Sequence, residues 1–414
     1  MGKIKSAVIL AVVLVWTAFG ALNGEVTRKN IRFVQYPDFP DAHSTWGSIG
    51  YSKVHQKIFI GVTNHQDKVG LFEYDVNRDR MRLCGFLPQL ANLQDFQWQG
   101  KVHSEIIEGP DGCMYFSTDG GESREEYLMN HPQGYGGGFF FKWNPAEDRL
   151  TNLGYGLQYE SIKDITVDRI SGRLMGISYP QAHLLLYDHQ KNDLRDLGRV
   201  GSDHVPRVLF SDWFGNMYYV DWRQRLIKYE HDTGKLIFAS DSLPAFDGTT
   251  GNRVVTGITA YAEDQANGVI YLVTYGSKIV AFYPTRLDFG RVEDLSGLYD
   301  GDPEVRKPYE YYCPNVGLGD NGLLYYFIGG HGSYVDGEEK NVMMEFDPQS
   351  KNKRIVLSFL LEEISEVTGS SVKDGNGNLY FCGRRRAPQA EMMGESGASR
   401  PFMIIFNPTK EIAP

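Results

Sequence analysis

Two kinds of apolar segment recur along almost the whole chain. The first is a turn followed by a short aromatic-rich strand, as in Gly112-Cys-Met-Tyr-Phe and Gly322-Leu-Leu-Tyr-Tyr. Six copies begin with a glycine, at positions 112, 172, 215, 268, 322 and 377, and a seventh begins with Gln56. A glycine turn followed by β-branched and aromatic residues is typical of a hairpin. The spacing, about 53 residues on average, indicates a repeated unit.

A second marker follows each copy of the first. It is an apolar strand that closes on a turn, as in Gly138-Phe-Phe-Phe-Lys-Trp-Asn-Pro and Asn341-Val-Met-Met-Glu-Phe-Asp-Pro, and it also occurs seven times. Each unit is therefore expected to be a four-stranded meander, with strand A before the glycine turn, B after it, C at the second marker and D last. One small twisted sheet cannot bury both of its faces, but sheets stacked around an axis can. The pattern predicts an all-β fold, a seven-bladed β-propeller of four-stranded antiparallel blades.

The last unit lacks room for its outer strand. It has an A strand near Ser371, a B strand at Leu379 and a C strand at Met403, but only six residues follow Asn407-Pro408. The segment Ile31–Tyr36, ahead of the first unit, has the composition of a strand. We expect it to complete the last blade, because pairing there joins the two ends of the chain and removes an open sheet edge.

The N-terminus has the pattern of an export signal. Lys3 and Lys5 precede an uncharged stretch that lasts until Glu25, and Ala18-Phe19-Gly20 offers small residues for cleavage. The sequence predicts a signal peptide over residues 1–20 and a single propeller domain over residues 21–414. The protein would then be secreted or periplasmic, with no stable membrane insertion after cleavage. An uncleaved anchor is the alternative, although the apolar part is short for a spanning helix.

Composition narrows the classes of partner. The 414 residues include 42% hydrophobic and 23% charged residues, which is ordinary for a globular protein and excludes a disordered or collagen-like chain. The net charge is −10, whereas a nucleic-acid-binding protein usually carries a basic excess, so no nucleic-acid partner is expected. Four cysteines allow three pairings; of these residues, Cys84 and Cys113 are expected in the core.

Histidines gather at one side of the predicted ring. The start of each A strand and the end of each B strand lie on the same side, because A and B are antiparallel neighbours. Five of the ten histidines fall at such positions: His103, His131, His183, His204 and His331. Each could be an ordinary loop histidine, but together they favour a ligand site at this side of the channel.

Four residues at the same side of the ring resemble those of a known family. His103 opens the second blade, His131 lies in the B–C loop of that blade, Tyr179 ends the B strand of the third blade, and Arg207 opens the fourth. An exported propeller with these residues resembles the propeller-fold ulvan lyases and, more distantly, the oligogalacturonate lyases. The likeness covers nearly the whole mature chain, but it consists of single residues at architectural positions.

The resemblance implies cleavage of uronic-acid glycans, including sulfated ones, by β-elimination. Arg207 would neutralise the uronate carboxylate, because its planar fork matches a carboxylate. His103 and Tyr179 would act as base and acid, in an order that the sequence does not decide. His131 would bind the carboxylate or share the proton transfer. Alternatively, Tyr179 stacks within its blade and Arg207 pairs with an acidic loop residue.

Further residues at this side suit an anionic polysaccharide. Arg384, followed by two more arginines, could bind sulfate or carboxylate groups together with Arg223. The aromatic residues Tyr135, Trp222 and Tyr275 could stack on sugar rings. A solvated arginine loop and ordinary packing of aromatic residues are the alternatives.

Two cysteines and a histidine form a second group of candidate site residues. Cys313, His331 and Cys382 fall in adjacent blades at the same side, and these ligand types suit a structural Zn²⁺ ion. A Cys313–Cys382 disulfide or two buried free thiols are the alternatives. No organic cofactor is expected.

Two other functions remain open from sequence. One is a non-catalytic extracellular propeller that binds a glycan or a protein. The other is a metal-dependent hydrolase or lactonase, which would need several carboxylate or asparagine ligands around the axis, where the sequence analysis finds His, Arg and Tyr instead. The fold alone does not choose among these functions.

Overall fold

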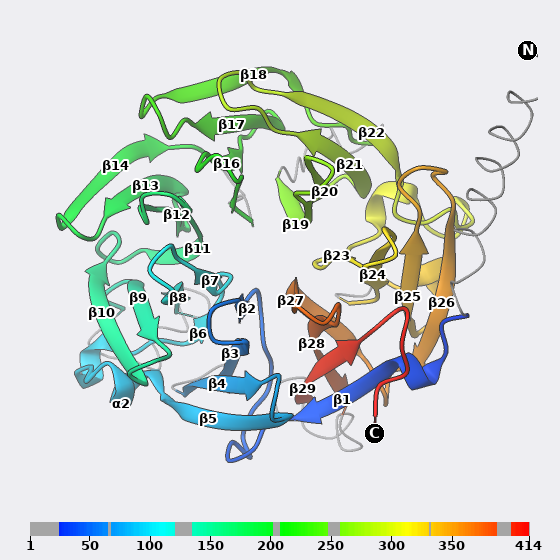
Figure 1. Ribbon diagram of the computed structural model, residues 1–414, viewed down its shortest axis with the longest axis horizontal. Helices are drawn as coiled ribbons and strands as arrows, with labels where there is room; N and C mark the ends of the chain where they lie inside the picture. The colour runs from blue at the N-terminus through cyan, green and yellow to red at the C-terminus, as the bar shows by residue number, and fades with distance from the viewer. Residues whose placement is uncertain are drawn as a thin grey trace, which may run out of the picture.

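Seven antiparallel sheets form a closed ring around a central channel (Figure 1). The computed structural model describes residues 25–64, 68–120, 135–201, 208–246, 257–330, 333–386 and 399–413. Six sheets contain four strands, and the remaining one contains five because its inner strand is split in two. The predicted seven-bladed β-propeller is therefore confirmed.

The strands follow the predicted order A to D from the axis outwards. Blade 1 consists of β2 (Ile49–Ser52), β3 (Lys57–Thr63), β4 (Val69–Asp75) and β5 (Arg80–Phe86), and blade 2 consists of β6 (Lys101–Val102), β7 (Ile107–Glu108), β8 (Met114–Asp119), β9 (Phe139–Asn144) and β10 (Arg149–Tyr155). Blade 3 consists of β11 (Ser161–Val167), β12 (Leu174–Tyr179), β13 (His183–Asp188) and β14 (Asp193–Arg199). Blade 4 consists of β15 (Phe210–Ser211), β16 (Met217–Val220), β17 (Arg225–Tyr229) and β18 (Leu236–Ser242).

The other three blades follow the same plan. Blade 5 consists of β19 (Ile258–Asp264), β20 (Val269–Thr274), β21 (Lys278–Tyr283) and β22 (Arg291–Gly297). Blade 6 consists of β23 (Gly317–Leu318), β24 (Leu324–Ile328), β25 (Lys340–Phe346) and β26 (Lys353–Leu360). Blade 7 consists of β27 (Glu366–Lys373), β28 (Leu379–Arg386), β29 (Ser399–Phe406) and β1 (Ile31–Gln35). The short helical segments are α2 (Leu87–Leu90), η1 (Arg28–Asn30), η2 (Asp95–Gln97), η3 (Pro308–Glu310) and η4 (Val335–Gly337).

Burial explains why the inner strands are continuous apolar runs. Every residue of the B strands β16 and β24 is buried, because each of these strands has a neighbouring blade on both faces. The outer strand β14 instead contains only exposed and half-buried residues. The aromatic-rich first marker of the sequence thus corresponds to strands that pack between blades.

A repeated aspartate holds the turn between strands A and B. The Asp212 carboxylate accepts hydrogen bonds from the backbone of Phe214 (2.9 Å) and Asn216 (3.0 Å) and from the Tyr218 hydroxyl (2.7 Å). Asp374 makes the same contacts in blade 7, including a 2.8 Å bond from the Tyr380 hydroxyl. The carboxylate satisfies backbone donors that the turn leaves unpaired, and it fixes the start of the buried B strand.

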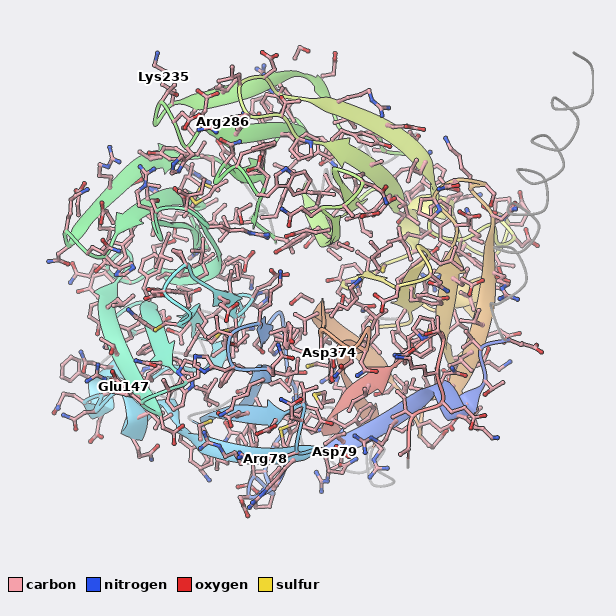
Figure 2. The ribbon with its side chains drawn as sticks, viewed as in Figure 1. Arg78, Asp79, Glu147, Lys235, Arg286 and Asp374 are labelled. Atoms are coloured by element: carbon pink, nitrogen blue, oxygen red, sulfur yellow. The ribbon has the colours of Figure 1, made fainter. Side chains whose placement is uncertain are left out.

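The outer edge of the ring carries exposed ion pairs. Figure 2 shows Arg78, Asp79, Glu147, Lys235 and Arg286 around the circumference, with Asp374 nearer the axis. The guanidinium of Arg286 binds Asp232 at 2.8 Å. Solvent screens such pairs, so each contributes little to stability.

The N-terminal strand completes the last blade. Strand β1 pairs antiparallel with β29, from Ile31 opposite Phe406 to Gln35 opposite Phe402, and the two lie side by side in Figure 1. The side-chain amide of Asn30 also donates a hydrogen bond to the Asn407 backbone carbonyl oxygen at 2.9 Å. The expected closure by Ile31–Tyr36 is confirmed, and it covers an edge that would otherwise expose unpaired backbone groups.

Blades 7 and 1 also meet at the inner side of the ring. The Ser370 hydroxyl donates to the Gly47 carbonyl oxygen at 2.7 Å, and the Thr368 hydroxyl donates to the Thr45 carbonyl oxygen. Between them, Gly369 has a φ of +74°, and a Cβ atom there would lie 1.6 Å from the Trp46 carbonyl oxygen. Only glycine allows so close a backbone approach.

No disulfide links the blades, since all four cysteines are free. Cys84 is half-buried, and the other three are buried. The disulfide alternative for Cys313 and Cys382 is therefore wrong. Within the described residues, no helix has the length and apolar character to cross a membrane.

Deletion of Ile31–Tyr36 should lower the melting temperature by about 10 °C or more, because it removes a whole ladder of hydrogen bonds and exposes β29. The exposed Gln35 offers a matched control, and Gln35→Ala should melt within about 2 °C of the wild type. Differential scanning calorimetry measures both. An unchanged melting curve for the deletion would contradict closure by β1.

Candidate functional site

Two cavities lie along the axis of the propeller. A narrow one of about 20 Å³ is lined by residues from all seven blades: Trp46, Gly47, His103, Glu105, Asp164, Val208, Thr259, Pro314, Gly369 and Ser370. A wider one of about 470 Å³ lies among the ends of the A strands, near the A–B turns. We call this end of the channel the A–B side, and the end where the B strands finish the B–C side. Glu105 lines both cavities.

His103 is held at the narrow cavity by backbone and aromatic contacts. Its side chain is buried (5% exposed), and its ring lies parallel to Trp46, with 6.1 Å between the ring centroids. Its Nδ1 atom lies 3.1 Å from the Lys163 carbonyl oxygen. Because a carbonyl only accepts hydrogen bonds, Nδ1 carries the proton, and Nε2 is the basic nitrogen of the neutral ring.

Tyr179 lies one blade further on, at the end of β12. Its side chain is 39% exposed, and the Lys163 ammonium lies 4.6 Å from the centre of its ring. The same ammonium binds Asp119 at 3.3 Å. Lys163 therefore connects the two predicted catalytic residues, contacting His103 through its backbone and Tyr179 through its side chain.

Tyr135 is not an open stacking surface. It is buried (7% exposed), with its ring 5.1 Å from that of Trp98. Its hydroxyl lies 3.2 Å from the Ser161 hydroxyl, which also contacts Asp119 at 3.3 Å. The Ser161 hydroxyl therefore links Tyr135 to Asp119, the carboxylate that binds the Lys163 ammonium.

The other predicted sugar-binding residues follow the ends of B strands. Trp222 is 55% exposed, and the Arg223 guanidinium lies 4.5 Å from its ring centre. Tyr275 is half-buried, 6.3 Å from the ring of Tyr312. Arg384 is bound by Glu366, with Nε 2.8 Å from Oε2. Trp222 and Arg223 thus form a cation–aromatic pair that is open to solvent, whereas Arg384 is held in an ion pair with Glu366.

Three predicted site residues cannot be placed. Arg207, His131 and His331 lie outside the described residues. Of the predicted catalytic group, His103 and Tyr179 both contact Lys163, one at its backbone and the other at its ammonium.

The two thiols of the predicted zinc group lie in apolar surroundings. Cys313 and Cys382 belong to different hydrophobic clusters. Burial raises the pKa of Cys313 to about 12 and that of Cys382 to about 11. These environments favour protonated thiols, whereas zinc binds thiolates. Zinc at this position stays a prediction, with no support from these two residues.

The wider cavity contains charged residues that the sequence analysis did not select. The Tyr261 hydroxyl donates to Glu105 Oε2 at 2.8 Å. Beside them, the Arg169 guanidinium binds both carboxylate oxygens of Glu263, with Nη1 2.8 Å from Oε2. Glu105 and the buried Asp164 add two carboxyl groups beside the axis to the His, Arg and Tyr residues predicted at the B–C side.

A break in the inner strand of blade 2 places Glu105 in the channel. Between β6 and β7, the Ser104 hydroxyl accepts the Ser117 backbone N–H at 2.8 Å, in place of a ladder bond. The Glu105 backbone N–H instead donates to Asp164 Oδ1 of the next blade at 3.1 Å. The sequence has no distinct signal for this cluster, since polar residues such as His103 and Lys163 occur in the same inner strands.

Removal from water shifts the two axial carboxyl groups in the same direction. Burial raises the pKa of Glu105 to about 7, while the Tyr261 and Ser370 hydroxyls oppose the shift. Burial and the nearby Glu105 raise the pKa of Asp164 well above its usual range. Two carboxylates this close in a narrow channel disfavour double ionisation. A carboxyl group that titrates near neutral pH in a cavity is typical of a binding or catalytic site.

Comparisons with known proteins identify the fold and nothing finer. No protein-family description and no curated protein matches the sequence. Similar solved structures include YCF48 from Cyanidioschyzon merolae (TM-score 0.54, 10% identity, covering 92% of this chain and 100% of that one). The WD40 repeats of RRP9 (0.53, 10%, 92% and 99%) and U3-55K (0.54, 11%, 92% and 100%) are alike to a similar degree. At these identities the likeness shows a propeller fold alone.

Glu105→Gln should flatten the dependence of stability on pH. The folded state holds the Glu105 proton up to about pH 7, whereas an unfolded glutamate releases it near 4.5, so wild-type stability falls as the pH rises between these values. At pH 8 the variant should be about 1–2 kcal/mol more stable than the wild type. Urea unfolding at pH 4.5, 6 and 8 measures this. A variant that loses stability with rising pH as steeply as the wild type would contradict the assignment.

Proposed function

We propose that this protein is a secreted lyase that binds a uronic-acid-containing polysaccharide at the B–C side and cleaves it by β-elimination. The observation that carries the proposal is the link through Lys163. One residue holds the His103 imidazole by its backbone and places a cation against the Tyr179 phenol. A base, a phenol and a positive charge on one face are the groups that this reaction needs.

The chemistry assigns each group a step. A uronate carboxylate acidifies the neighbouring C5–H, and a cation that pairs with the carboxylate stabilises the developing negative charge. A base, His103 Nε2 or the Tyr179 oxygen, takes the C5 proton. The electron pair of that C–H bond forms the C4=C5 double bond, and the C4–O bond breaks. An acid, the other of the two residues, protonates the leaving oxygen. Arg207 keeps its predicted part in neutralising the carboxylate, and His131 keeps its predicted part in binding the carboxylate or sharing the proton transfer.

The surface around this position suits an anionic polysaccharide. Trp222 and Arg223 form an exposed aromatic and cationic pair at the end of the next blade's B strand. An aromatic ring can stack on a sugar, while the guanidinium binds a carboxylate or a sulfate. Tyr275 and Arg384 would extend this surface to later blades.

Binding without cleavage is a second candidate, favoured by the burial of His103. A ring that is 5% exposed and stacked on Trp46 reaches a bound sugar only if Nε2 faces the substrate. Without that access, the cation–aromatic pairs of the B–C side would still bind an acidic glycan.

The test is an assay for the unsaturated product. Ulvan, pectate and glucuronan fragments should give a new ultraviolet absorbance from the C4=C5 double bond. Tyr179→Phe, His103→Gln and Arg207→Ala should each lower the rate at least 100-fold, because proton transfer and charge neutralisation contribute about 10²–10⁴ each. Melting curves confirm that the variants are folded.

Tyr159→Phe is the matched control. Tyr159 is another exposed tyrosine, two residues before β11 of the same blade, and it has no part in the proposed reaction. Its variant should keep the wild-type rate. Tight glycan binding without product would support the binding candidate, and neither binding nor product with any of the three polysaccharides would overturn both.

A further inference from the structure

The wider cavity on the A–B side has no part in the proposed lyase reaction. Its volume of about 470 Å³ falls in the range of small-ligand sites. Its walls come from six of the seven blades, and they include Ile106, Ala262, Val316, Leu318 and Val372. The cavity is therefore large enough for an organic molecule and partly apolar.

The inner end of the cavity is lined by two carboxyl groups and one cation. Glu105 and Glu263 lie there with the Arg169 guanidinium, while Asp164 lines the adjoining narrow cavity. The two lysines of the lining, Lys53 and Lys373, end or follow A strands at the outer end, and Lys373 binds Asp320 at 3.2 Å. Both carboxylate oxygens of Glu263 bind the Arg169 guanidinium in a bidentate ion pair. In the described part of the chain, no lysine or arginine forms an ion pair with Glu105 or Asp164. A carboxylate removed from water without a cation is costly, so a positively charged ligand would be stabilising here.

We infer that this cavity binds a small organic cation, with its ammonium group at Glu105 and its carbon chain against the apolar walls. An anionic ligand would be repelled by the ionised Glu105, which forms no ion pair with a lysine or arginine of the described residues. A bare metal ion would leave most of the cavity unfilled, and Ca²⁺ takes six to eight oxygen ligands. Asp164 already accepts backbone N–H groups of Glu105 at 3.1 Å and Leu209 at 2.7 Å. An alkylammonium ion matches both the charge and the apolar walls.

Protonation should control this binding. The Glu105 carboxyl is faced by Asp164 of β11, by Arg169, by Tyr261 and Glu263 of β19, by Ser370 of β27, and by His103 across the narrow cavity. Burial raises the pKa of Glu105 to about 7, so the carboxyl is mostly neutral below that pH. The cation should therefore bind more weakly as the pH falls from 8 to 6.

Titration calorimetry of the full-length protein with n-butylammonium chloride tests the inference. We expect one site per chain at pH 8, affinity at least fivefold weaker at pH 6, and no binding of n-butanol or sodium butyrate. Glu105→Gln should weaken the binding at least tenfold. Glu108→Gln is the matched control, because Glu108 lines the same cavity but is held by the Ser52 hydroxyl at 2.6 Å; it should stay within twofold of the wild type.

A second variant keeps the test decisive if Glu105→Gln does not fold. Tyr261→Phe removes the hydroxyl that stabilises the Glu105 carboxylate, so the midpoint of the pH dependence of binding should move upwards. Three results would overturn the inference: no butylammonium binding at 10 mM, equal binding of butanol, or binding of calcium chloride without binding of the amine. Because this cavity lies away from Tyr179, lyase activity and cation binding can fail independently.

Discussion

The pairing of β1 with β29 is the constraint on which the rest of the molecule depends. Each blade buries its faces only against its neighbours, so a propeller is stable as a ring and weak as an open arc. Outside, β1 supplies the fourth strand of blade 7. Inside, blades 7 and 1 touch through Ser370 and Gly47. The axial groups come from blades that are distant in sequence, and they meet only because the ring closes.

The two sides of the channel carry different chemistry. On the B–C side, cations lie against exposed aromatic rings that end or follow B strands, as Lys163 does against Tyr179 and Arg223 against Trp222. On the A–B side, Glu105 lies at the junction of the wide and narrow cavities, where burial raises its pKa to about 7. The proposed polysaccharide site and the proposed cation site therefore lie at opposite ends of the channel.

Sequence reasoning predicts most of the fold because its signals are local and repeated. The glycine turns, the buried B strands and the missing outer strand of the last unit each follow from residues close together in the chain, and closure by Ile31–Tyr36 follows from counting strands. The positions of Tyr179 and Trp222 at the ends of B strands follow from the same count.

The axial cluster could not be predicted in this way. Glu105 reaches the channel because the Ser104 hydroxyl replaces a ladder bond, and Asp164 turns inward at a shift in the register between β11 and β12. Nor could the sequence foresee that Lys163 joins His103 to Tyr179, or that Glu366 binds Arg384. Each of these contacts depends on how individual side chains are placed in the folded ring, for which the chain carries no periodic signal.

The absence of sulfur–sulfur bonds has a practical consequence for how this molecule is obtained. Its ring is held by strand pairing, aspartate turns and packed aromatic residues, and its four thiols are all reduced. Native structure therefore requires no oxidant and no disulfide exchange. Recombinant chain should reach the same conformation under reducing and under oxidising conditions.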